Sequence, residues 1–275
     1  ERRGAGEFVY GDGGHRDIHP CTPGRASELV EKPGSHNAAE AGLMVAAARK
    51  YKRLVQMGNQ RRSYPLIIEA MQRLREGVIG KVLSSRTFYS NRRGSIGRGK
   101  PAPVPKHLNY DLWQGPAPER PYKDNLIPYN WHWHWHYGGG EMANNGVHAL
   151  DLARWGLGVD LPKRVTFGGG RYHFDDDQET PDTGMATFDF GHCTALWDQS
   201  SCNQRKSEAL PFVAFYGESG ILTTTGGHNY TLYDLAGKEV ERKSQSASDI
   251  LHFTNFVNAI RNGEKLNAEI GDGQV

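Results

Sequence analysis

The chain has 275 residues, of which 37% are hydrophobic, and a formal net charge of only +2 at pH 7. This small charge excludes nucleic acid or an anionic membrane surface as the main partner, and no apolar run approaches the roughly 20 residues of a membrane span. Residues 1–30 lack the apolar core of a signal peptide, and the three cysteines are a sparse, odd set, so we expect a reduced, cytoplasmic protein, with an exported form left open.

The N-terminal part of the chain changes character near residue 30. Residues 1–30 are rich in Gly, Arg, Asp and Pro and show no periodic pattern, so we expect an irregular segment there. A helical pattern then begins after Ser35 or Asn37, either of which can cap a helix, and continues to Tyr51. Residues 54–57 follow as a short strand. Together they predict a helix-then-strand unit of the α/β kind.

A second helix is predicted to open at Ser63 and Pro65. Its expected buried stripe is Ile67, Met71, Leu74 and Val78. Residues 81–90 are predicted to form a strand, because their apolar and β-branched residues fit a sheet. A loop of about 40 residues follows, and loops of that length are functional or disordered. The aromatic run Trp131–His136 at its end favours order.

The C-terminal part of the chain is predicted to be mainly β-structure followed by one helix. Strands are predicted over residues 164–167, 185–190, 193–197, 211–216, 220–223, 230–233 and 239–242. The final helix is expected to start near Ser248 and to bury Ile250, Phe253, Val257 and Ile260. This order predicts an α/β (α+β) fold: an open, mostly antiparallel sheet with helices on one face, preceded by a fragment of an α/β unit.

The rest of the chain is expected to be organised around residues 138–155. Three glycines open this stretch and a helical pattern follows. Asn144, His148 and Asp151 are spaced to share one helix face, which apolar residues continue. An imidazole titrates near neutrality and can take the proton of an alcohol as a hydride leaves. The alternative is a structural histidine that bonds to Asp151 one turn later.

A second candidate for chemistry is the tripeptide Glu31-Lys32-Pro33. Pro33 stiffens the chain and can adopt a cis peptide bond. A lysine held at the end of a strand can orient a hydroxyl group or stabilise an alkoxide. The alternative for Lys32 is an ordinary solvated surface lysine.

The third candidate is the run Trp131–His136. If this run is a strand, its side chains alternate, so the three histidines point one way and the three tryptophans the other. Histidines on one face can chelate zinc, with Glu141 or His148 completing the site. The alternative is an aromatic rim that stacks a sugar ring, and because no helix motif supplies a fixed fourth ligand we predict no metal.

Several segments match one family pattern when they are taken together. They are Glu31-Lys32-Pro33, residues 55–62 (VQMGNQRR), residues 109–116 and 129–133, Gly146-x-His148-x-x-Asp151, residues 217–220 and residues 253–256. This combination resembles the glucose–fructose oxidoreductase/inositol dehydrogenase (Gfo/Idh/MocA) superfamily. The resemblance covers about residues 31–270.

The resemblance implies a two-domain oxidoreductase that uses NAD or NADP and acts on a sugar, polyol or glycoside hydroxyl group. By similarity, Lys32 is the active-site lysine, His148 donates or accepts the proton, and Asp151 orients His148 or contacts the substrate, with Asn144 beside them. The implied cofactor-binding residues are Glu31, Lys32, Pro33, Gln60 and Arg61. The implied substrate-binding residues are Trp131, His132, Trp133, His134 and Asn145.

The chain departs from the family pattern in two ways. Many members carry Asp where this chain has Asn144, and an amide cannot transfer a proton or raise the pKa of His148 by its charge. The glycine-rich nucleotide fingerprint belongs well before Glu31, but only 30 residues precede it. We therefore expect a chain that lacks most of the Rossmann domain: an irregular segment at 1–30, a Rossmann remnant at 31–62 and a substrate and oligomerisation domain at 63–275.

Two other functions stay open at this level. One is a non-catalytic carbohydrate-binding or assembly module, and the other is a metal-dependent lyase or hydrolase that uses His132, His134 and His136. The expected partners are a small-molecule sugar or polyol and further copies of the chain, since an exposed sheet face favours a homo-oligomer. The sequence does not choose the sugar, NAD over NADP, or net redox over a redox-assisted lyase reaction.

Overall fold

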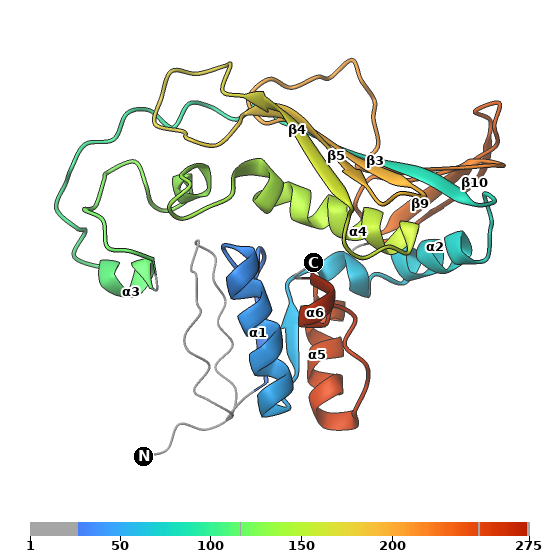
Figure 1. Cartoon of the computed structure of the whole chain (residues 1–275), viewed down its shortest axis with the longest axis horizontal. Coiled ribbons are helices and arrows are strands. Elements are labelled where there is room, and N and C mark those ends of the chain that lie inside the picture. The colour runs from blue at the N-terminus through green and yellow to red at the C-terminus, as the bar shows by residue number, and fades with distance from the viewer. Residues whose placement is uncertain (1–26, 116, 247, 274–275) are drawn as a thin grey trace.

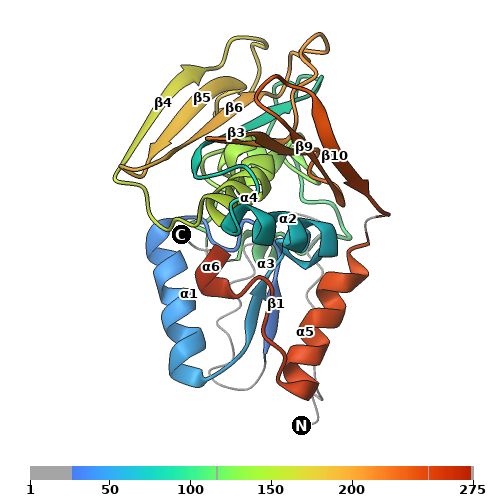
Figure 2. The same ribbon diagram turned by 90° about the vertical axis from the view of Figure 1, so that its right-hand side faces the viewer.

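A computed structural model describes residues 27–115, 117–246 and 248–273 of the chain. It consists of a large sheet with helices beneath it and a smaller unit below those helices (Figure 1). The smaller unit is a two-stranded parallel sheet with three helices beside it (Figure 2). Its elements are β1 (Glu28–Val30), α1 (Ala38–Tyr51), β2 (Val55–Met57), α5 (Ile250–Asn262) and α6 (Ile270–Gly273).

Across the described ranges, the large sheet has eight strands in the order β10-β9-β8-β7-β3-β6-β5-β4, and only β3 and β6 pair in parallel. Its strands are β3 (Val82–Ser90), β4 (Arg164–Gly170), β5 (Thr183–Asp189), β6 (Thr194–Ser200), β7 (Val213–Gly217), β8 (Ile221–Thr224), β9 (Asn229–Tyr233) and β10 (Glu239–Ser244). The predicted open, mostly antiparallel sheet with helices on one face is therefore confirmed. The hairpin that turns after β5 at residues 191–192 is also where the sequence placed it.

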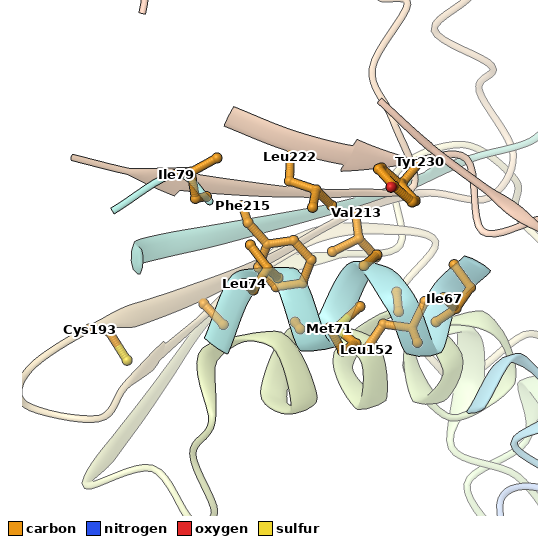
Figure 3. Close-up of a cluster of buried hydrophobic side chains, with 14 of the residues drawn as sticks. Ile67, Met71, Leu74, Ile79, Leu152, Cys193, Val213, Phe215, Leu222 and Tyr230 are labelled. Atoms are coloured by element: carbon orange, nitrogen blue, oxygen red, sulfur yellow. The ribbon is translucent and has the colours of Figure 1, made fainter. Parts of the chain in front are cut away.

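Two helices, α2 (Pro65–Arg75) and α4 (Val147–Leu157), cover one face of this sheet and form the main core with it (Figure 3). Ile67, Met71 and Leu74 of the predicted α2 stripe are buried against the sheet. Helix α4 passes close to β7 at Gly156, where an added Cβ would lie 2.3 Å from the ring of Phe215. Close packing of this kind requires glycine, so the core fixes where α4 lies under the sheet.

The start of the described chain differs from the prediction. Residues 28–30 were expected to be irregular, but they form β1, which pairs in parallel with β2 in the register Glu28 to Val55. A strand of three residues is too short to show a periodic pattern, so the sequence gives no signal for it. Residues 1–26 of the predicted irregular segment lie outside the described residues.

The C-terminal helix packs with the small unit, and its predicted buried face is wrong. Ile250 and Ile260 are 62% and 51% exposed, whereas His252, Phe256 and Ala259 are buried. Hydrogen bonds of His252 to Ser63 and to the backbone of Met57 turn this face inward. The hydrophobic pattern did not identify this buried face because its most buried residue, His252, is polar. The predicted division of the chain at residues 62 and 63 stays a prediction, although α5 and α6 lie beside β1 and β2 rather than beneath the large sheet (Figure 2).

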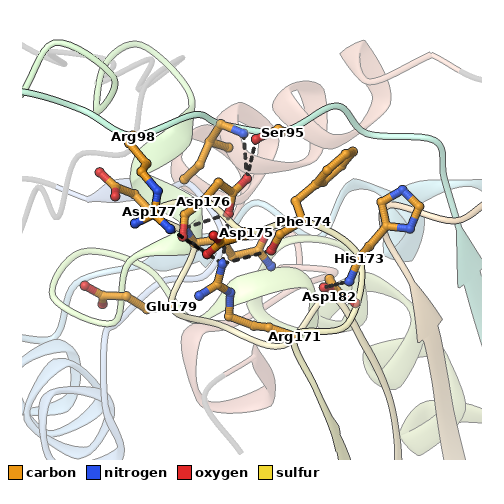
Figure 4. Close-up of polar contacts among 12 residues, drawn as sticks. Ser95, Arg98, Arg171, His173, Phe174, Asp175, Asp176, Asp177, Glu179 and Asp182 are labelled. Carbon is orange, nitrogen blue, oxygen red and sulfur yellow. Dashed lines mark hydrogen bonds and ion pairs between the residues drawn. The ribbon is translucent and has the colours of Figure 1, made fainter.

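The long loop after β3 is ordered by hydrogen bonds to the acidic segment between β4 and β5 (Figure 4). Asp176 Oδ2 accepts from the Ser95 hydroxyl at 2.8 Å and from the Ile96 amide at 2.9 Å. Asp177 accepts from the Gly99 amide at 2.8 Å. The loop carries the short helix α3 (Tyr110–Gln114) and leads to the Trp–His run. Within the described ranges, no helix is long and apolar enough to cross a membrane.

Candidate functional site

The predicted site residues gather where β1 and β2 end. Because these strands are parallel, their carboxyl ends lie at the same edge, which is where α/β sheets bind ligands. Glu31 and Lys32 follow β1, with a cis peptide bond between Lys32 and Pro33. Gln60 follows β2, and its Nε2 lies 3.5 Å from Glu31 Oε1. Gly58 leaves room for this arrangement, since an added Cβ would lie 2.9 Å from Glu31 Oε2.

Lys32 reaches from this edge to the start of the central helix. Its Nζ donates to Asn144 Oδ1 at 2.7 Å and to the Asn144 backbone oxygen at 3.0 Å. Asn144 lies in a π-helical turn, Met142–Gly146, which precedes α4. Such turns are rare and are frequent at functional sites. Burial lowers the pKa of Lys32, while Glu31 and Glu141 act in the opposite direction.

His148 lies in the first turn of α4, next to these groups. Burial lowers its pKa well below the usual range, and the positive charges of Arg61 and Lys32 lower it further. Its Nδ1 has no hydrogen-bond partner in the described part of the chain. The side chain is therefore a neutral imidazole whose buried nitrogen is not used by the fold, which fits a group that exchanges a proton with a ligand.

Asp151 does not hold His148 in this structure. Both of its carboxylate oxygens accept from Arg62 Nε at 2.9 Å, and a terminal nitrogen of Arg62 lies 2.8 Å from Oδ1. Both side chains are buried. The interpretation of Asp151 as the partner that orients His148 is therefore wrong: a buried ion pair with Arg62 joins α4 to the 3-10 turn Gln60–Ser63 instead.

Glu141 is a site residue that the sequence suggested only as a zinc ligand. It is 2% exposed, and its Oε1 accepts a short hydrogen bond from Asn145 Nδ2. Burial raises its pKa, whereas Asn145 and Ser201 lower it through hydrogen bonds. The available signal was a carboxylate directly before the turn that carries Asn144 and Asn145. Its charge acts on Lys32, so it belongs to the same electrostatic site.

The Trp–His run is not a strand. Residues Asn130–Trp133 form a 3-10 turn, so the three histidines do not share a face. His132 Nδ1 bonds to the backbone oxygen of Tyr129 at 2.6 Å, His134 Nδ1 lies 3.6 Å from Glu179 Oε1, and His136 Nε2 bonds to the backbone of Pro118 at 2.7 Å. The strand prediction that supported the metal-dependent alternative is wrong. Nowhere in the described ranges do three His, Cys, Asp or Glu side chains form a group suited to a metal.

The same turn also changes the predicted sugar rim. Trp131 and Trp133 are 6% and 1% exposed, so neither presents a ring face to a ligand. His132 stays in the site, because burial lowers its pKa to about 4 and Lys32 lowers it too. Tyr129 is half exposed, and its hydroxyl accepts from Asn144 Nδ2 at 3.2 Å. Tyr129 is therefore the aromatic residue of this segment that reaches the site, and the alternation pattern could not identify it.

Arg61 connects the site to the large sheet. Its Nε donates to the backbone oxygen of Gly226 at 2.6 Å, and its guanidinium lies 5.0 Å from the ring centroid of Phe212. A cavity of about 400 Å³ has Phe212 and Tyr89 among its lining residues. Tyr89 is coupled electrostatically to Glu141 and Tyr129. The cavity is therefore connected to the site through two lining residues: Phe212, which contacts Arg61, and Tyr89, which interacts with Glu141.

Comparison with known proteins agrees with this architecture. Residues 81–182 match the model of an oxidoreductase family, described as its C-terminal alpha/beta domain. A comparison with curated protein sequences gives no match. Among solved structures, the fold resembles an aldose-aldose oxidoreductase from Caulobacter crescentus complexed with glycerol (18% identity, TM-score 0.65). That alignment covers 90% of this chain and 66% of that one.

Two further structures share the fold. One is the WlbA dehydrogenase from Bordetella pertussis in complex with NADH and UDP-GlcNAcA (15% identity, TM-score 0.60, 90% of this chain and 65% of that one). The other is an oxidoreductase from Agrobacterium radiobacter in complex with NAD+, L-tartaric acid and magnesium (16% identity, TM-score 0.59, 90% and 67%). The chain thus spans about two thirds of the length of the structures it resembles.

Proposed function

We propose that the protein is a nicotinamide-dependent oxidoreductase of a sugar or polyol hydroxyl and a member of the Gfo/Idh/MocA family. The match of residues 81–182 to the C-terminal alpha/beta domain of this oxidoreductase family supports the proposal. The observation that carries the proposal is the Lys32–Asn144 hydrogen bond at 2.7 Å, with the neutral His148 beside it. A cation and a proton acceptor next to each other are what the oxidation of an alcohol requires.

His148 is the proposed proton acceptor. The unpartnered Nδ1 supports this role, because a buried nitrogen without a partner is costly unless a ligand uses it. In the oxidation direction, the imidazole takes the hydroxyl proton as the carbon–hydrogen bond breaks. In the reduction direction, it returns the proton to the alkoxide.

Lys32 is proposed to orient the reacting hydroxyl. Two of the three hydrogens on its ammonium group point to Asn144, which leaves one for a ligand oxygen. The positive charge stabilises an alkoxide as it forms. Asn144 fixes the lysine without exchanging protons, so His148 is the group left to carry the proton.

The edge formed by β1 and β2 fits the predicted cofactor. Gly58 keeps the backbone close to Glu31, and Glu31, Lys32, Pro33 and Gln60 gather where parallel strands bind dinucleotides. When bound, a nicotinamide would supply the hydride acceptor or donor. The neighbours that were solved with NADH and NAD+ support a nicotinamide, and the choice between NAD and NADP is part of the test.

The proposal is tested by calorimetric titration of NAD and NADP into the chain and into the variant Lys32→Ala. Lys106→Ala is the matched control, because Lys106 is exposed and far along the chain in the loop after β3. We expect one dinucleotide to bind and the Lys32 variant to bind it more weakly. If neither dinucleotide binds to the folded chain, the oxidoreductase proposal is lost for this chain, and sugar binding without cofactor would favour the carbohydrate-binding alternative.

Turnover provides the second test. We expect His148→Gln to lower kcat about 10²–10⁴-fold, the usual contribution of a general acid–base group, while the fold is retained. The measurement is nicotinamide absorbance with a panel of sugars and polyols. A variant with unchanged kcat would remove His148 from the mechanism.

We further propose that the chain forms a homo-oligomer. Val165 and Phe167 lie on one face of the strand β4 at the end of the sheet and are 51% and 45% exposed, which offers an apolar surface to a second copy of the chain. Light scattering of the purified chain tests this proposal, and a monomer at micromolar concentration would refute it.

A further inference from the structure

Arg61 occupies an unusual position for a cation. Its backbone belongs to the 3-10 turn after β2, and its side chain extends to Gly226 and the ring of Phe212 at the edge of the large sheet. The guanidinium thus lies next to the large sheet, and the cofactor contact that the family resemblance implies for Arg61 stays a prediction.

In the described part of the chain, no carboxylate forms an ion pair with Arg61. The two acids whose charges act on it most directly are already engaged: Asp249 accepts from the Tyr64 hydroxyl at 2.7 Å, and Asp151 is paired with Arg62. Of its five N–H donors, only Nε–H has an acceptor among the described residues, the backbone oxygen of Gly226. The two terminal nitrogens remain for another partner.

Burial of this cation has a cost that the protein offsets only in part. Burial is the largest effect and lowers the pKa of Arg61, although the charges of Asp249 and Asp151 raise it. Lys32, the next cation in the site, also contacts amide oxygens of Asn144 rather than a carboxylate. The site therefore presents two positive charges beside the neutral His148.

We propose that Arg61 forms a subsite for an anionic group on the substrate, a carboxylate or a phosphate, so that the protein acts on an acidic sugar rather than a neutral one. The terminal nitrogens of a guanidinium match the two oxygens of a carboxylate or phosphate in a bidentate geometry. The inference rests on the proposed function only for the identity of the ligand as a sugar.

An anion at Arg61 also bears on His148. Burial is the main cause of the lowered pKa of His148, and the positive charge of Arg61 lowers it further. A carboxylate bound to the guanidinium would offset the contribution of Arg61, so the pKa of the imidazole would rise when the substrate is present. Binding of the acidic group would thus be coupled, through Arg61, to the pKa of His148.

The test is calorimetric binding of D-glucose, D-glucuronate and D-glucose 6-phosphate to the full chain, without cofactor, at low and high salt. A charge-assisted hydrogen bond is worth about 1.5–3 kcal/mol, so we expect at least one acid to bind about tenfold or more tightly than glucose. The acid that binds more tightly shows whether the subsite prefers a carboxylate or a phosphate. The variant Arg61→Gln is expected to bind the acid and glucose equally, and the matched control Arg261→Gln, an exposed arginine of α5, to keep the preference.

The proposal is overturned if glucose binds as tightly as both acids, if neither acid binds detectably, or if Arg61→Gln keeps the preference. Circular dichroism checks the fold of that variant, and if it does not fold, Arg61→Lys replaces it. Lysine keeps the charge but loses the bidentate geometry, so a partial loss of preference is expected. Dinucleotide binding is measured separately, so a failure of the oxidoreductase proposal is distinguishable from a failure of the anion subsite.

Discussion

The ammonium of Lys32 donates to both the side-chain and the backbone oxygen of Asn144, at 2.7 and 3.0 Å, across 112 residues of sequence. This pair joins the end of β1 to the start of the central helix, and it contains only one charge. The partner is an amide, so Lys32 is held by hydrogen bonds without an ion pair. The uncharged partner makes this position the clearest place to test the electrostatics of the site.

Asn144→Asp should raise the pKa of Lys32, because a carboxylate at hydrogen-bond distance favours the charged ammonium. The measurement is the pH dependence of acetylation of Lys32 by acetic anhydride, followed by mass spectrometry. The midpoint should move to higher pH in the variant and stay unchanged in Asn262→Asp, which adds the same charge at an exposed position. An unchanged midpoint in Asn144→Asp would mean that the Lys32–Asn144 contact does not persist in solution.

Asp151→Asn should lower the free energy of unfolding and leave the pKa of His148 nearly unchanged. The substitution leaves the buried guanidinium of Arg62 without its counter-charge, and breaking a buried pair in this way costs about 3–5 kcal/mol. Urea denaturation measures the loss, and NMR titration of His148 checks its pKa. The double variant Arg62→Met with Asp151→Leu should recover part of the stability. A large change in the pKa of His148 with full stability would restore Asp151 as its orienting partner.

Stability should fall as the pH drops below about 6.5, the ordinary pKa of histidine. Burial lowers the pKa of His252 in the folded state, so below pH 6.5 the unfolded chain binds the proton more readily and unfolding becomes more favourable. Above pH 6.5, His252 is neutral in both the folded and the unfolded chain, so its titration costs no stability there. In the neutral ring, Nε2 donates to the backbone oxygen of Met57 at 2.9 Å and Nδ1 accepts from the Ser63 hydroxyl at 2.7 Å, so the fold satisfies both nitrogens without a second proton.

Urea denaturation at pH 8, 6.5 and 5 measures this dependence. His132 and His148 act in the same direction, because their pKa values are lowered too. The variant His252→Gln should be less stable at pH 8 but should lose less stability on acidification. A chain whose stability stays constant from pH 8 to pH 5 would contradict the buried, neutral His252.

Two glycine-to-alanine substitutions in helices should have opposite effects. In Gly156→Ala the new Cβ would lie 2.3 Å from the Phe215 ring and 3.0 Å from Leu74, so α4 or the sheet must move, at a cost of about 1–3 kcal/mol. In Gly42→Ala of α1 nothing lies within 4 Å, and the gain in helix propensity should stabilise the protein by about 0.5–1 kcal/mol. Thermal unfolding measures both. A Gly156 variant that matches the wild type would show that α4 is not packed tightly on β7.

The sequence by itself determined most of the elements and the region of the site. Periodic apolar residues predicted α2 and most of the strands, because a helix or strand half-buried on one sheet repeats at its own period. The Glu-Lys-Pro and Gly-x-His-x-x-Asp motifs pointed to Lys32 and His148, and helical spacing added Asn144; the structure brings these three residues together at one edge.

Only the tertiary structure decided which partners these side chains take. Asp151 has the right spacing to reach His148 along a helix, but Arg62, 89 residues away in the chain, takes both of its oxygens. Trp131 and Trp133 look like a sugar rim and are buried, because the segment turns where a strand was expected. Arg61 donates to the backbone oxygen of Gly226, 165 residues away in the chain, a contact that no local spacing predicts. Local spacing reports which residues share a face, whereas ion pairs and burial depend on segments that are distant in sequence and meet only in the folded chain.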